Sequence, residues 1–399
     1  MRLILCGPYI NVHGLGRLAM TSRVFGRRYN TGTRLISRGH ACGLSLIEEV
    51  IRIRCNKIEG NGIALDLSPS RSVWKRLLCL TESTAAGLVL ENNNTKIVSS
   101  RTNPYTIIVP HGITSIGVGA FKRCSELTSL ILSDTVTTID MDAFKNCRRL
   151  NCIIQSANVT TIGNDAFANC SSLTTLSLLD GVTNIGAGAF FNCYCLTSLT
   201  LPMGLTAIPK CVLHSCHNLT SLTLPAGLIE IPERALARCS RLVSLILPDT
   251  VTAIGLGAFT QCSRVTSLDL PVGLTTIGGI AFTDCTALTS IVIPHSVTVI
   301  GQGAFWNCTS LTSINLPDGL TNIGRGAFYG CTNLISLTLP PKVTTIGCQL
   351  VKDCSRLTSL ILPGGATVIM GDAFDKDTSD CSLNDDRLGS WHILSFHDI

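Results

Sequence analysis

LTSIVIPHSVTVIGQGAFWNCTS, residues 288–310, is followed directly by LTSINLPDGLTNIGRGAFYGCTN, residues 311–333. The two stretches have the same length and share their Leu, Ile, Pro, Ala-Phe and Cys places. Eleven cysteines keep this spacing without exception, at Cys124, Cys147, Cys170, Cys193, Cys216, Cys239, Cys262, Cys285, Cys308, Cys331 and Cys354. Such a period predicts a chain that winds through the same coil repeatedly, because each coil presents the same residue to the same neighbour.

Two apolar columns run in register with the cysteines. Isoleucine recurs with the same period from Ile116 to Ile369, in twelve coils out of twelve. Phenylalanine stands five places after the isoleucine in nine of these coils, and the exceptions Leu213, Leu236 and Val351 are also apolar. Nine of the chain's 12 phenylalanines lie in this one column, which predicts that the aromatic residues form the core and not a recognition surface.

Each coil also contains a segment typical of a strand. In residues 219–225 the leucines Leu222 and Leu224 alternate with Ser221 and Thr223, and Pro225 follows. Alternation with a period of two indicates a half-buried strand, and proline ends it because it has no N–H group. Parallel stacking at roughly 4.8 Å per coil predicts a solenoid about 55 Å long.

A glycine follows the isoleucine in eight coils, as at Gly117 and Gly255. Pro209 and Pro232 occupy the same place in two other coils, and the proline ring restricts φ to negative values. If the coils share one backbone path, this glycine does not serve a left-handed conformation. We expect it to allow close approach between neighbouring coils.

The cysteine column predicts reduced thiols. Equivalent residues in adjacent coils lie about 4.8 Å apart and point the same way, whereas a disulfide needs Cβ atoms roughly 3.8 Å apart on converging vectors. We therefore expect the eleven cysteines to behave as small buried hydrophobic residues. Their number does not indicate a cellular compartment.

The unit L-T-S-L-x-L-P-x-G-L-T-x-I-G-x-x-A-F-x-x-C-x-x resembles the BspA-type leucine-rich repeat over about residues 105–375. The resemblance implies an α/β solenoid: a right-handed superhelix of about twelve 23-residue coils, with parallel strands on its concave face. It also implies binding and not catalysis, since members of that family are mostly surface adhesins or interaction proteins.

The chain divides into four predicted parts. Residues 1–85 form a basic segment without the repeat, residues 86–106 an N-terminal cap, residues 107–375 the solenoid, and residues 376–399 an acidic C-terminal cap or tail. Residues 1–104 carry 15 Lys and Arg against 6 Asp and Glu. Seven arginines precede the first acidic residue, Glu48, a pattern that resembles an organelle transit peptide; a disordered basic arm or a misassigned start codon is the alternative.

Local signals predict short elements before the repeat. Ser45 and Glu48 form a capping box that favours a helix, and residues 72–80 favour a second helix. Residues 88–90, followed by three asparagines and residues 96–98, predict a hairpin. No apolar run is long enough to predict a membrane-spanning helix.

The sequence contains no phosphate-binding loop, zinc-protease or serine-hydrolase motif, so we expect neither an enzyme nor a cofactor. Cys211, His214, Cys216 and His217 would suit zinc by residue type. However, Cys216 belongs to the inward column, so neighbouring ligands would face different ways, and repeat drift is the preferred interpretation. The same applies to the acidic C-terminal residues, which predict a solvated cap and not a calcium site. The slightly acidic solenoid disfavours nucleic acid.

Binding by the strand face would use the variable place between the strand leucines. The candidate partner-binding residues are Thr223, Ile246, Asp269, Val292, Asn315 and Thr338. This row has no aromatic anchor and almost no charge, which predicts weak or distributed binding to a protein partner. The row does not identify the partner or the oligomeric state.

Two settings for such a binding protein remain open. An extracellular adhesin would carry glycans at the sequons Asn93, Asn158, Asn169, Asn218 and Asn307, whereas an intracellular scaffold, cytosolic or imported into an organelle, would keep its thiols reduced. Coils 205–227 and 228–250 lose the glycine and phenylalanine columns together, which predicts either a local change of curvature or drift without consequence.

Overall fold

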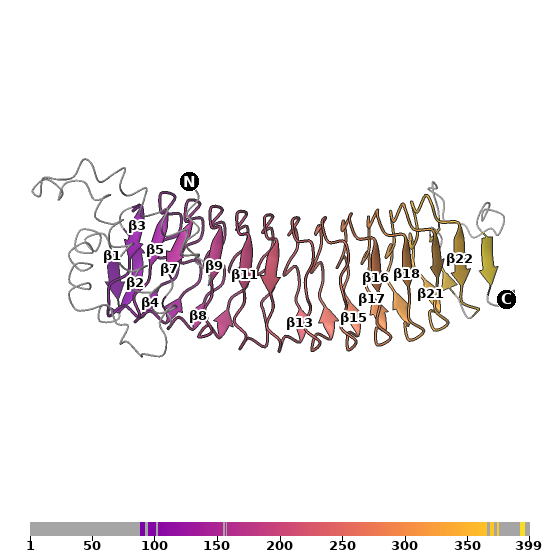
Figure 1. Cartoon of the computed structure of the whole chain (residues 1–399), viewed down its shortest axis with the longest axis horizontal. Helices are drawn as coiled ribbons and strands as arrows, with labels where there is room; N and C mark the ends of the chain where they lie inside the picture. Colours follow the sequence, from indigo (N-terminus) through magenta and orange to yellow (C-terminus); the bar gives the residue numbers. More distant parts are fainter. Residues whose placement is uncertain are drawn as a thin grey trace, which may run out of the picture.

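The computed structural model describes residues 88–91, 95–100, 103–154, 156, 158–364, 368–370, 373–374 and 392–395. They form one elongated stack of coils that follows the chain from its first repeat to its last (Figure 1). Most coils contribute one short strand to each of two columns, and the strands of a column pair in parallel with the next coil. The fold is a parallel β-solenoid of about twelve turns.

The first column, the Leu column, contains the strands expected from the Ser-Leu pattern. It comprises β3 (Thr106–Ile108), β5 (Ser129–Ile131), β7 (Cys152–Ile154), β9 (Thr175–Ser177), β11 (Ser198–Thr200), β12 (Ser221–Thr223), β16 (Ser290–Val292), β18 (Ser313–Asn315), β20 (Ser336–Thr338), β22 (Ser359–Leu362) and β24 (His392–Ser395). Leu199 pairs with Leu222 of the next coil, and both side chains are buried while Ser221 and Thr223 are exposed. The period-two prediction is therefore confirmed.

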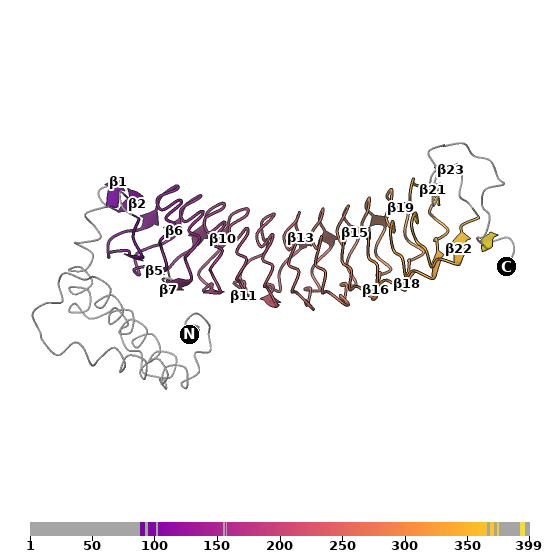
Figure 2. The same cartoon turned by 90° about the horizontal axis from the view of Figure 1, so that it is seen from above.

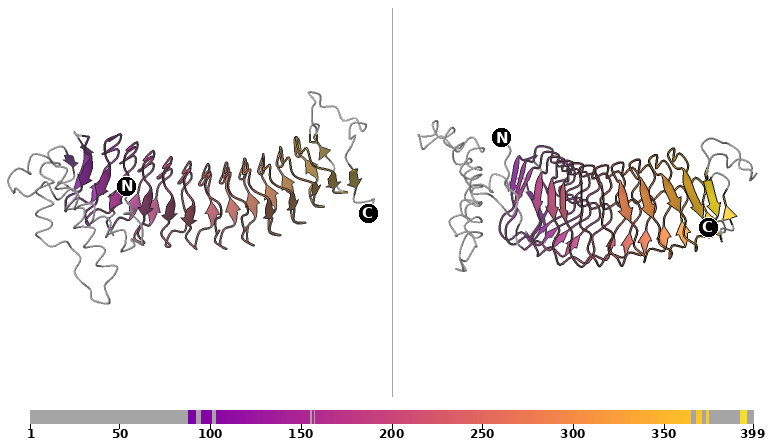
Figure 3. Two further views of the ribbon diagram at one scale, coloured as in Figure 1. Left: turned by 45° about the horizontal axis from the view of Figure 1, so that its top comes forward. Right: turned by 45° about the vertical axis from the view of Figure 1, so that its right-hand side comes forward.

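The second column, the Ile column, contains shorter strands around the isoleucines. It comprises β2 (Lys96–Ser100), β4 (Ser115–Ile116), β6 (Thr138–Ile139), β8 (Thr161–Ile162), β10 (Asn184–Ile185), β13 (Glu230–Ile231), β14 (Ala253–Ile254), β15 (Thr276–Ile277), β17 (Val299–Ile300), β19 (Asn322–Ile323), β21 (Thr345–Ile346) and β23 (Val368–Ile369). Ile254 pairs with Ile277, and both are fully or almost fully buried. The two columns run side by side along the whole stack (Figure 3).

A third side, the turn side, connects the Ile column to the cysteine. The described residues contain no helix, so the α/β class implied by the resemblance is not confirmed. The turns instead continue the hydrogen bonding between coils: the Phe121 N–H donates to the Ala143 carbonyl at 2.8 Å, and the Arg123 N–H donates to the Lys145 carbonyl at 2.7 Å. Hydrogen bonding between coils therefore continues on the turn side without a helix.

Two residues in every turn have positive φ. One stands three places after the isoleucine, as in Gly257 (φ 61°) and Asp165 (φ 54°), and the other directly precedes the cysteine, as in Asn146 (φ 66°). Left-handed backbone favours Gly, Asn and Asp, which explains why these residue types recur at both places. Other residue types also occur there, and among those in the described turns Ile280, at φ 47°, is the one β-branched residue.

The glycine that directly follows the isoleucine has a different role. Its φ is not positive, and a Cβ atom added at Gly255 would lie 2.8 Å from the Glu233 nitrogen of the preceding coil. At Gly301 the same distance, to the Gly279 nitrogen, would be 2.3 Å. The prediction that this glycine allows close approach between coils is confirmed.

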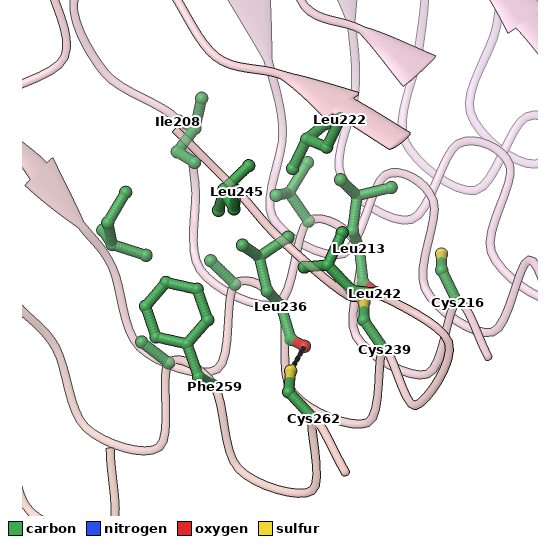
Figure 4. Packing of buried hydrophobic residues seen from close by; sticks show 14 of the residues in the cluster. Ile208, Leu213, Cys216, Leu222, Leu236, Cys239, Leu242, Leu245, Phe259 and Cys262 are labelled. Atoms are coloured by element: carbon green, nitrogen blue, oxygen red, sulfur yellow. Dashed lines mark hydrogen bonds between the residues drawn. The ribbon is translucent and has the colours of Figure 1, made fainter. Parts of the chain in front are cut away.

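The phenylalanine column forms the centre of the core. Eight of its rings are at most 1% exposed, and successive rings stack across coils, as Phe259 on Phe282 at 5.3 Å and Phe282 on Phe305 at 5.4 Å between centroids. The stack is interrupted where Leu213 and Leu236 replace phenylalanine, and both leucines are fully buried. Figure 4 shows these leucines packed with Leu222 and Leu245 from the Leu column.

Strand pairing also occurs at the two ends of the stack. β1 (Leu88–Glu91) pairs antiparallel with β2, and β2 continues the Ile column, so the predicted hairpin is confirmed. At the other end β24 pairs in parallel with β22. The expected helices near Ser45 and in residues 72–80, the basic segment 1–85 and most of the acidic tail lie outside the described residues.

The stack is bowed along its length. In the view of Figure 2, β5, β7, β11, β16 and β18 follow the outward-bowed edge, and β6, β10, β13, β15 and β19 follow the opposite edge. The expected position of the Leu column on a concave face is therefore not confirmed, and right-handed coiling remains a prediction.

Coil 205–227 interrupts the Ile column, because this coil contributes no strand to that column between β10 and β13. Pro209 accounts for part of this, because it has no N–H to donate to the Ile185 carbonyl.

The buried phenylalanine stack predicts a large cost for truncation. Phe282→Ala should lower the free energy of unfolding by about 3–5 kcal/mol, because it leaves a cavity between two stacked rings. Chemical denaturation of the full chain measures this, with exposed Thr286→Ala as the control, expected within about 0.5 kcal/mol of the parent. An unchanged midpoint for Phe282→Ala would show that the column is not buried.

The positive φ of Ile280 predicts a stabilising substitution. Ile280→Gly should raise the free energy of unfolding by about 1 kcal/mol, because a left-handed conformation costs a side-chain-bearing residue roughly 1–2 kcal/mol. Gly303→Ala, at the same place in the next coil, should change stability in the opposite direction. Destabilisation by Ile280→Gly would contradict the assigned backbone conformation.

Candidate functional site

The outward side chains of the Leu column form the surface that we call the strand face. All six predicted partner-binding residues lie on it and are exposed: Thr223, Ile246, Asp269, Val292, Asn315 and Thr338. Ile246 and Val292 are 89% and 77% exposed. The same row is buried at its N-terminal end, where Ile131 and Ile154 are only 5% and 9% exposed. The exposed part of the strand face therefore lies in the middle and C-terminal coils.

A ladder of threonines borders the strand face. The Thr197 hydroxyl donates to the Thr174 carbonyl at 3.1 Å, and the Thr220 hydroxyl donates to the Thr197 carbonyl at 3.1 Å. The backbone N–H of Thr220 donates to the same Thr197 carbonyl at 2.9 Å. Each threonine thus adds a side-chain hydrogen bond to the backbone bond between adjacent coils.

The Leu column is interrupted three times, between β7 and β9, between β12 and β16, and between β18 and β20. Each interruption adjoins or contains a coil in which the ladder threonine is replaced, by Asn151, Val243 or Ile335. Valine and isoleucine cannot donate a side-chain hydrogen bond, and asparagine does not make the threonine bond here. At Val243 and Ile335, loss of the ladder side chain coincides with loss of strand pairing to the preceding coil, whereas the coil of Asn151 keeps that pairing through β5 and β7.

The longest interruption exposes unpaired backbone. Residues 244–246 and 267–269 are not strands, and no backbone hydrogen bond joins residues 220–224 to residues 243–247. A hollow of about 660 Å³ lies at this junction, lined by residues 220–224, 226 and 244–250. Backbone N–H and C=O groups at such a junction can pair with an added strand, as they do in β-augmentation.

The hollow is aliphatic and acidic. Ile246 and Asp249 line it, and Asp269 stands in the next coil of the same row. The lining includes no Lys, Arg or His. Val272 occupies the place of Asp249 in the next coil, and its side chain is 84% exposed. The three most exposed large apolar side chains among the described residues, Ile246, Val272 and Val292, thus belong to neighbouring coils near the interruption.

Comparison with known proteins identifies the repeat. A model of the family described as "BspA type Leucine rich repeat region (6 copies)" matches residues 99–220, 183–308 and 275–385. These matches cover well over half of the chain.

The chain belongs to the BspA-type leucine-rich repeat family.

Solved structures agree with this assignment. The BspA-type chain is 30% identical to a leucine-rich cell surface protein from Faecalibacterium prausnitzii A2-165, with a TM-score of 0.53 over 72% of this chain and 89% of that one. It is 25% identical to a leucine-rich repeat protein from Bacteroides ovatus ATCC 8483, with a TM-score of 0.52 over 71% and 88% of the two chains. A comparison with curated protein sequences found no match.

The cysteine column is a second place where chemistry could reside. All eleven thiols are free and buried, so the predicted reduced state is confirmed. They are also hydrogen-bond donors, which the sequence interpretation missed: from Cys147 to Cys354, each Sγ donates to the carbonyl of the phenylalanine-column residue 26 positions earlier. Figure 4 shows this bond from Cys262 to the Leu236 carbonyl, at 3.2 Å.

Burial makes most of these thiols unreactive. It raises the pKa of the Cys193, Cys262 and Cys354 thiols to about 12, and it raises the pKa of the other ladder thiols between Cys170 and Cys331 well above the ordinary value of 9.0. A nucleophile or metal ligand must be a thiolate. The thiols from Cys170 to Cys354 therefore stay protonated at neutral pH and contribute to the fold.

The predicted alternative zinc cluster is not assembled. The Cys216 thiol donates inward to the Phe190 carbonyl, while the His214 ring stacks on Phe191 at 4.9 Å and the His217 ring stacks on Tyr194 at 5.2 Å. Burial and, secondarily, the positive charges of Arg238 and Arg234 lower the pKa of His214. Among the described residues no three His, Cys, Asp or Glu side chains are grouped to hold a metal ion.

The stacked pairs show that some aromatic residues lie outside the core. Phe191 and Tyr194 are on the turn side, as are Trp306 and Tyr329, whose rings are 4.7 Å apart. The expectation that aromatic residues serve only the core holds for the phenylalanine column but is wrong for these four. Their spacing, one full repeat from a second aromatic or histidine ring, was the signal that could have indicated them.

The sequons differ in accessibility. Asn158 is exposed, with its amide bonded to the Asp134 carbonyl at 2.6 Å. Asn169 and Asn307 are half-buried, and their amides donate to Asn146 Oδ1 and Asp284 Oδ1. Asn218 Oδ1 accepts a bond from Arg241, and Asn93 lies outside the described residues.

The thiol column predicts alkaline unfolding. In the unfolded chain these cysteines lose their protons near their ordinary pKa of 9.0, whereas in the folded chain Cys262 keeps its proton until about pH 12. The contribution of each buried thiol to the free energy of unfolding is fully present below about pH 9. It is lost as pH rises toward 12, by about 1.4 kcal/mol per pH unit for each thiol.

Denaturation midpoints measured from pH 7.5 to pH 10.5 test this expectation. The denaturation midpoint of the parent should fall steeply above pH 9. The midpoint of Cys262→Ala should fall less steeply, because this variant releases about one proton fewer on unfolding. Equal slopes for the parent and Cys262→Ala would contradict it.

Proposed function

We propose that this BspA-type protein is a non-enzymatic binding protein, adhesin-like or an interaction scaffold, that holds a protein partner on its strand face. The observation that carries the proposal is the interruption at residues 243–247, where exposed aliphatic side chains, unpaired backbone groups and a hollow coincide. The family membership and the likeness to a cell surface protein support this class of function.

The chemistry of the hollow defines the partner segment. Unpaired N–H and C=O groups favour an extended peptide, which can supply main-chain hydrogen bonds. Ile246 would bury against an aliphatic side chain of that peptide, and Asp249 and Asp269 favour a flanking Lys or Arg. Cytosolic or organellar scaffolding is the alternative setting for the same binding surface. No helix in the described part of the chain has the length and apolar character needed to cross a membrane.

Peptide selection and two opposed substitutions test this function. A displayed library of random twelve-residue peptides would be selected on the full chain, and the affinity of the best peptides measured by fluorescence anisotropy. Ile246→Asp should weaken binding by about tenfold or more, because it removes the burial of one aliphatic side chain. Val243→Thr should also weaken it, since it restores the ladder hydroxyl and favours pairing with the preceding coil.

Ile229→Asp is the matched control, because Ile229 is 58% exposed but lies beside the Ile column. It should leave the affinity within about twofold of the parent. Peptides that bind all three variants and the parent equally, or a library that yields no binder, would contradict a binding role for the strand face.

A further inference from the structure

A cluster of basic residues on the turn side has no acidic counterpart of the kind found in the N-terminal coils. The cluster, which we call the basic patch, comprises Lys210, Arg234, Arg238, Arg241 and Arg264, all exposed. They belong to three consecutive coils, and Arg241 and Arg264 occupy the same place in adjacent coils. The patch stands out because the part of the chain after residue 104 contains more acidic than basic residues.

Several basic residues of the N-terminal coils are neutralised by neighbours. Lys122 pairs with Asp142 at 2.8 Å, Lys145 lies between Asp142 and Asp165, and Arg149 pairs with Glu126. In the basic patch, by contrast, the described residues provide one acidic contact, a distance of 3.9 Å from Arg234 to Glu233. Four of the five cations therefore have no carboxylate partner within the described coils.

Neutral acceptors orient two of the guanidinium groups. Arg238 Nε donates to Gln261 Oε1 at 2.9 Å, and Arg241 Nη1 donates to Asn218 Oδ1 at 3.0 Å. An amide oxygen holds a guanidinium in place without cancelling its charge. The remaining N–H donors of these exposed side chains are available to an anion, and guanidinium groups bind oxyanions in a bidentate manner.

Two imidazole rings lie beside these cations. His214 and His217 stack on Phe191 and Tyr194 of the preceding coil. In the following coil their places are taken by the small residues Ala237 and Ser240. Both imidazoles are half-buried between coils, and the unneutralised arginines extend beside them on the exposed turn side.

Much of the backbone of this side is already engaged in bonds between coils. The N–H groups of Leu213, Ser215, Arg234, Leu236 and Arg238 all donate to carbonyls of the next coil, at 2.6–3.0 Å. An extended peptide would find few backbone groups to pair with here, in contrast to the strand face. We therefore expect a ligand of this surface to be held by side-chain charges, which suits a chain of sugar rings bearing anionic groups.

We propose that the basic patch binds a sulfated polysaccharide. The guanidinium groups of Arg234, Arg238 and Arg241 contact its sulfate groups. This site is separate from the peptide-binding surface proposed above, so Ile246→Asp should leave it unaffected. The two proposals can therefore fail independently.

Titration of the full chain with a size-defined heparin oligosaccharide tests the site by calorimetry at moderate salt. Arg234→Gln, Arg238→Gln and Arg241→Gln combined should weaken binding by about tenfold or more and flatten its dependence on salt concentration, because fewer ionic contacts form. The matched control combines Lys342→Gln, Lys352→Gln and Arg356→Gln. It removes the same charge, and Arg356 bonds to Asn333 Oδ1 much as Arg241 bonds to Asn218.

The control should stay within about twofold of the parent, and both variants should keep the parent's thermal unfolding midpoint, since all the arginines changed are exposed. Equal losses in the two triple variants, or parent-like binding by the patch variant, would overturn the proposal by assigning the affinity to general charge or to other residues. Poly-glutamate binding as tightly as the oligosaccharide, with the same dependence on the patch, would also overturn it, because the ligand class would be wrong.

Discussion

Hydrogen bonding between equivalent residues of adjacent coils is the constraint on which the rest of the structure depends. On two sides of the solenoid it takes the form of parallel strand pairs, and on the turn side it is made by single N–H groups aimed at the next coil. A coil of a different length would place every later residue out of register with its neighbour. The fixed spacing of cysteines, isoleucines and phenylalanines follows from this requirement.

Side chains reinforce the backbone in two of these ladders. Threonine hydroxyls border the strand pairs, and thiols bond to the carbonyls of the phenylalanine column, which also accept the backbone N–H of the cysteine in their own coil. The cysteine is thus small enough for the core and still satisfies a carbonyl between coils. Where Val243 and Ile335 replace the threonine, strand pairing with the preceding coil is absent. At Val243 this loss coincides with the surface proposed to bind a partner.

The irregular coils are concentrated in one part of the chain. Coils 205–227 and 228–250 contain Pro209 and Pro232, lose the phenylalanine column, and are followed by the longest interruption of the Leu column. The same coils contain the hollow on the strand face and most of the basic patch on the turn side. This coincidence is the reason why both proposed binding surfaces are assigned to this segment of the stack.

The sequence predicted the solenoid, its strands, the buried phenylalanines and the role of the glycine after each isoleucine, because these depend on periodicity alone. It did not predict the helix-free turn side: two left-handed residues per turn are visible only as a mixed column of Gly, Asn, Asp and other residues. Thr223 and Ile246 could be placed on the strand face from alternation. The interruption of the Leu column between these two residues could not be predicted, because it depends on hydrogen bonds that Val243 does not make.

Hydrogen exchange of the intact chain, measured by mass spectrometry, tests whether the ladder between coils is interrupted at Val243. We expect slow exchange in the turns that run from phenylalanine to cysteine, such as residues 282–285 and 305–308, because their N–H groups bond between or within coils. We expect fast exchange in residues 243–247, where no such bonds form. Equal protection of residues 243–247 and of β11 and β12 would contradict the account, because the Leu column would then be continuous.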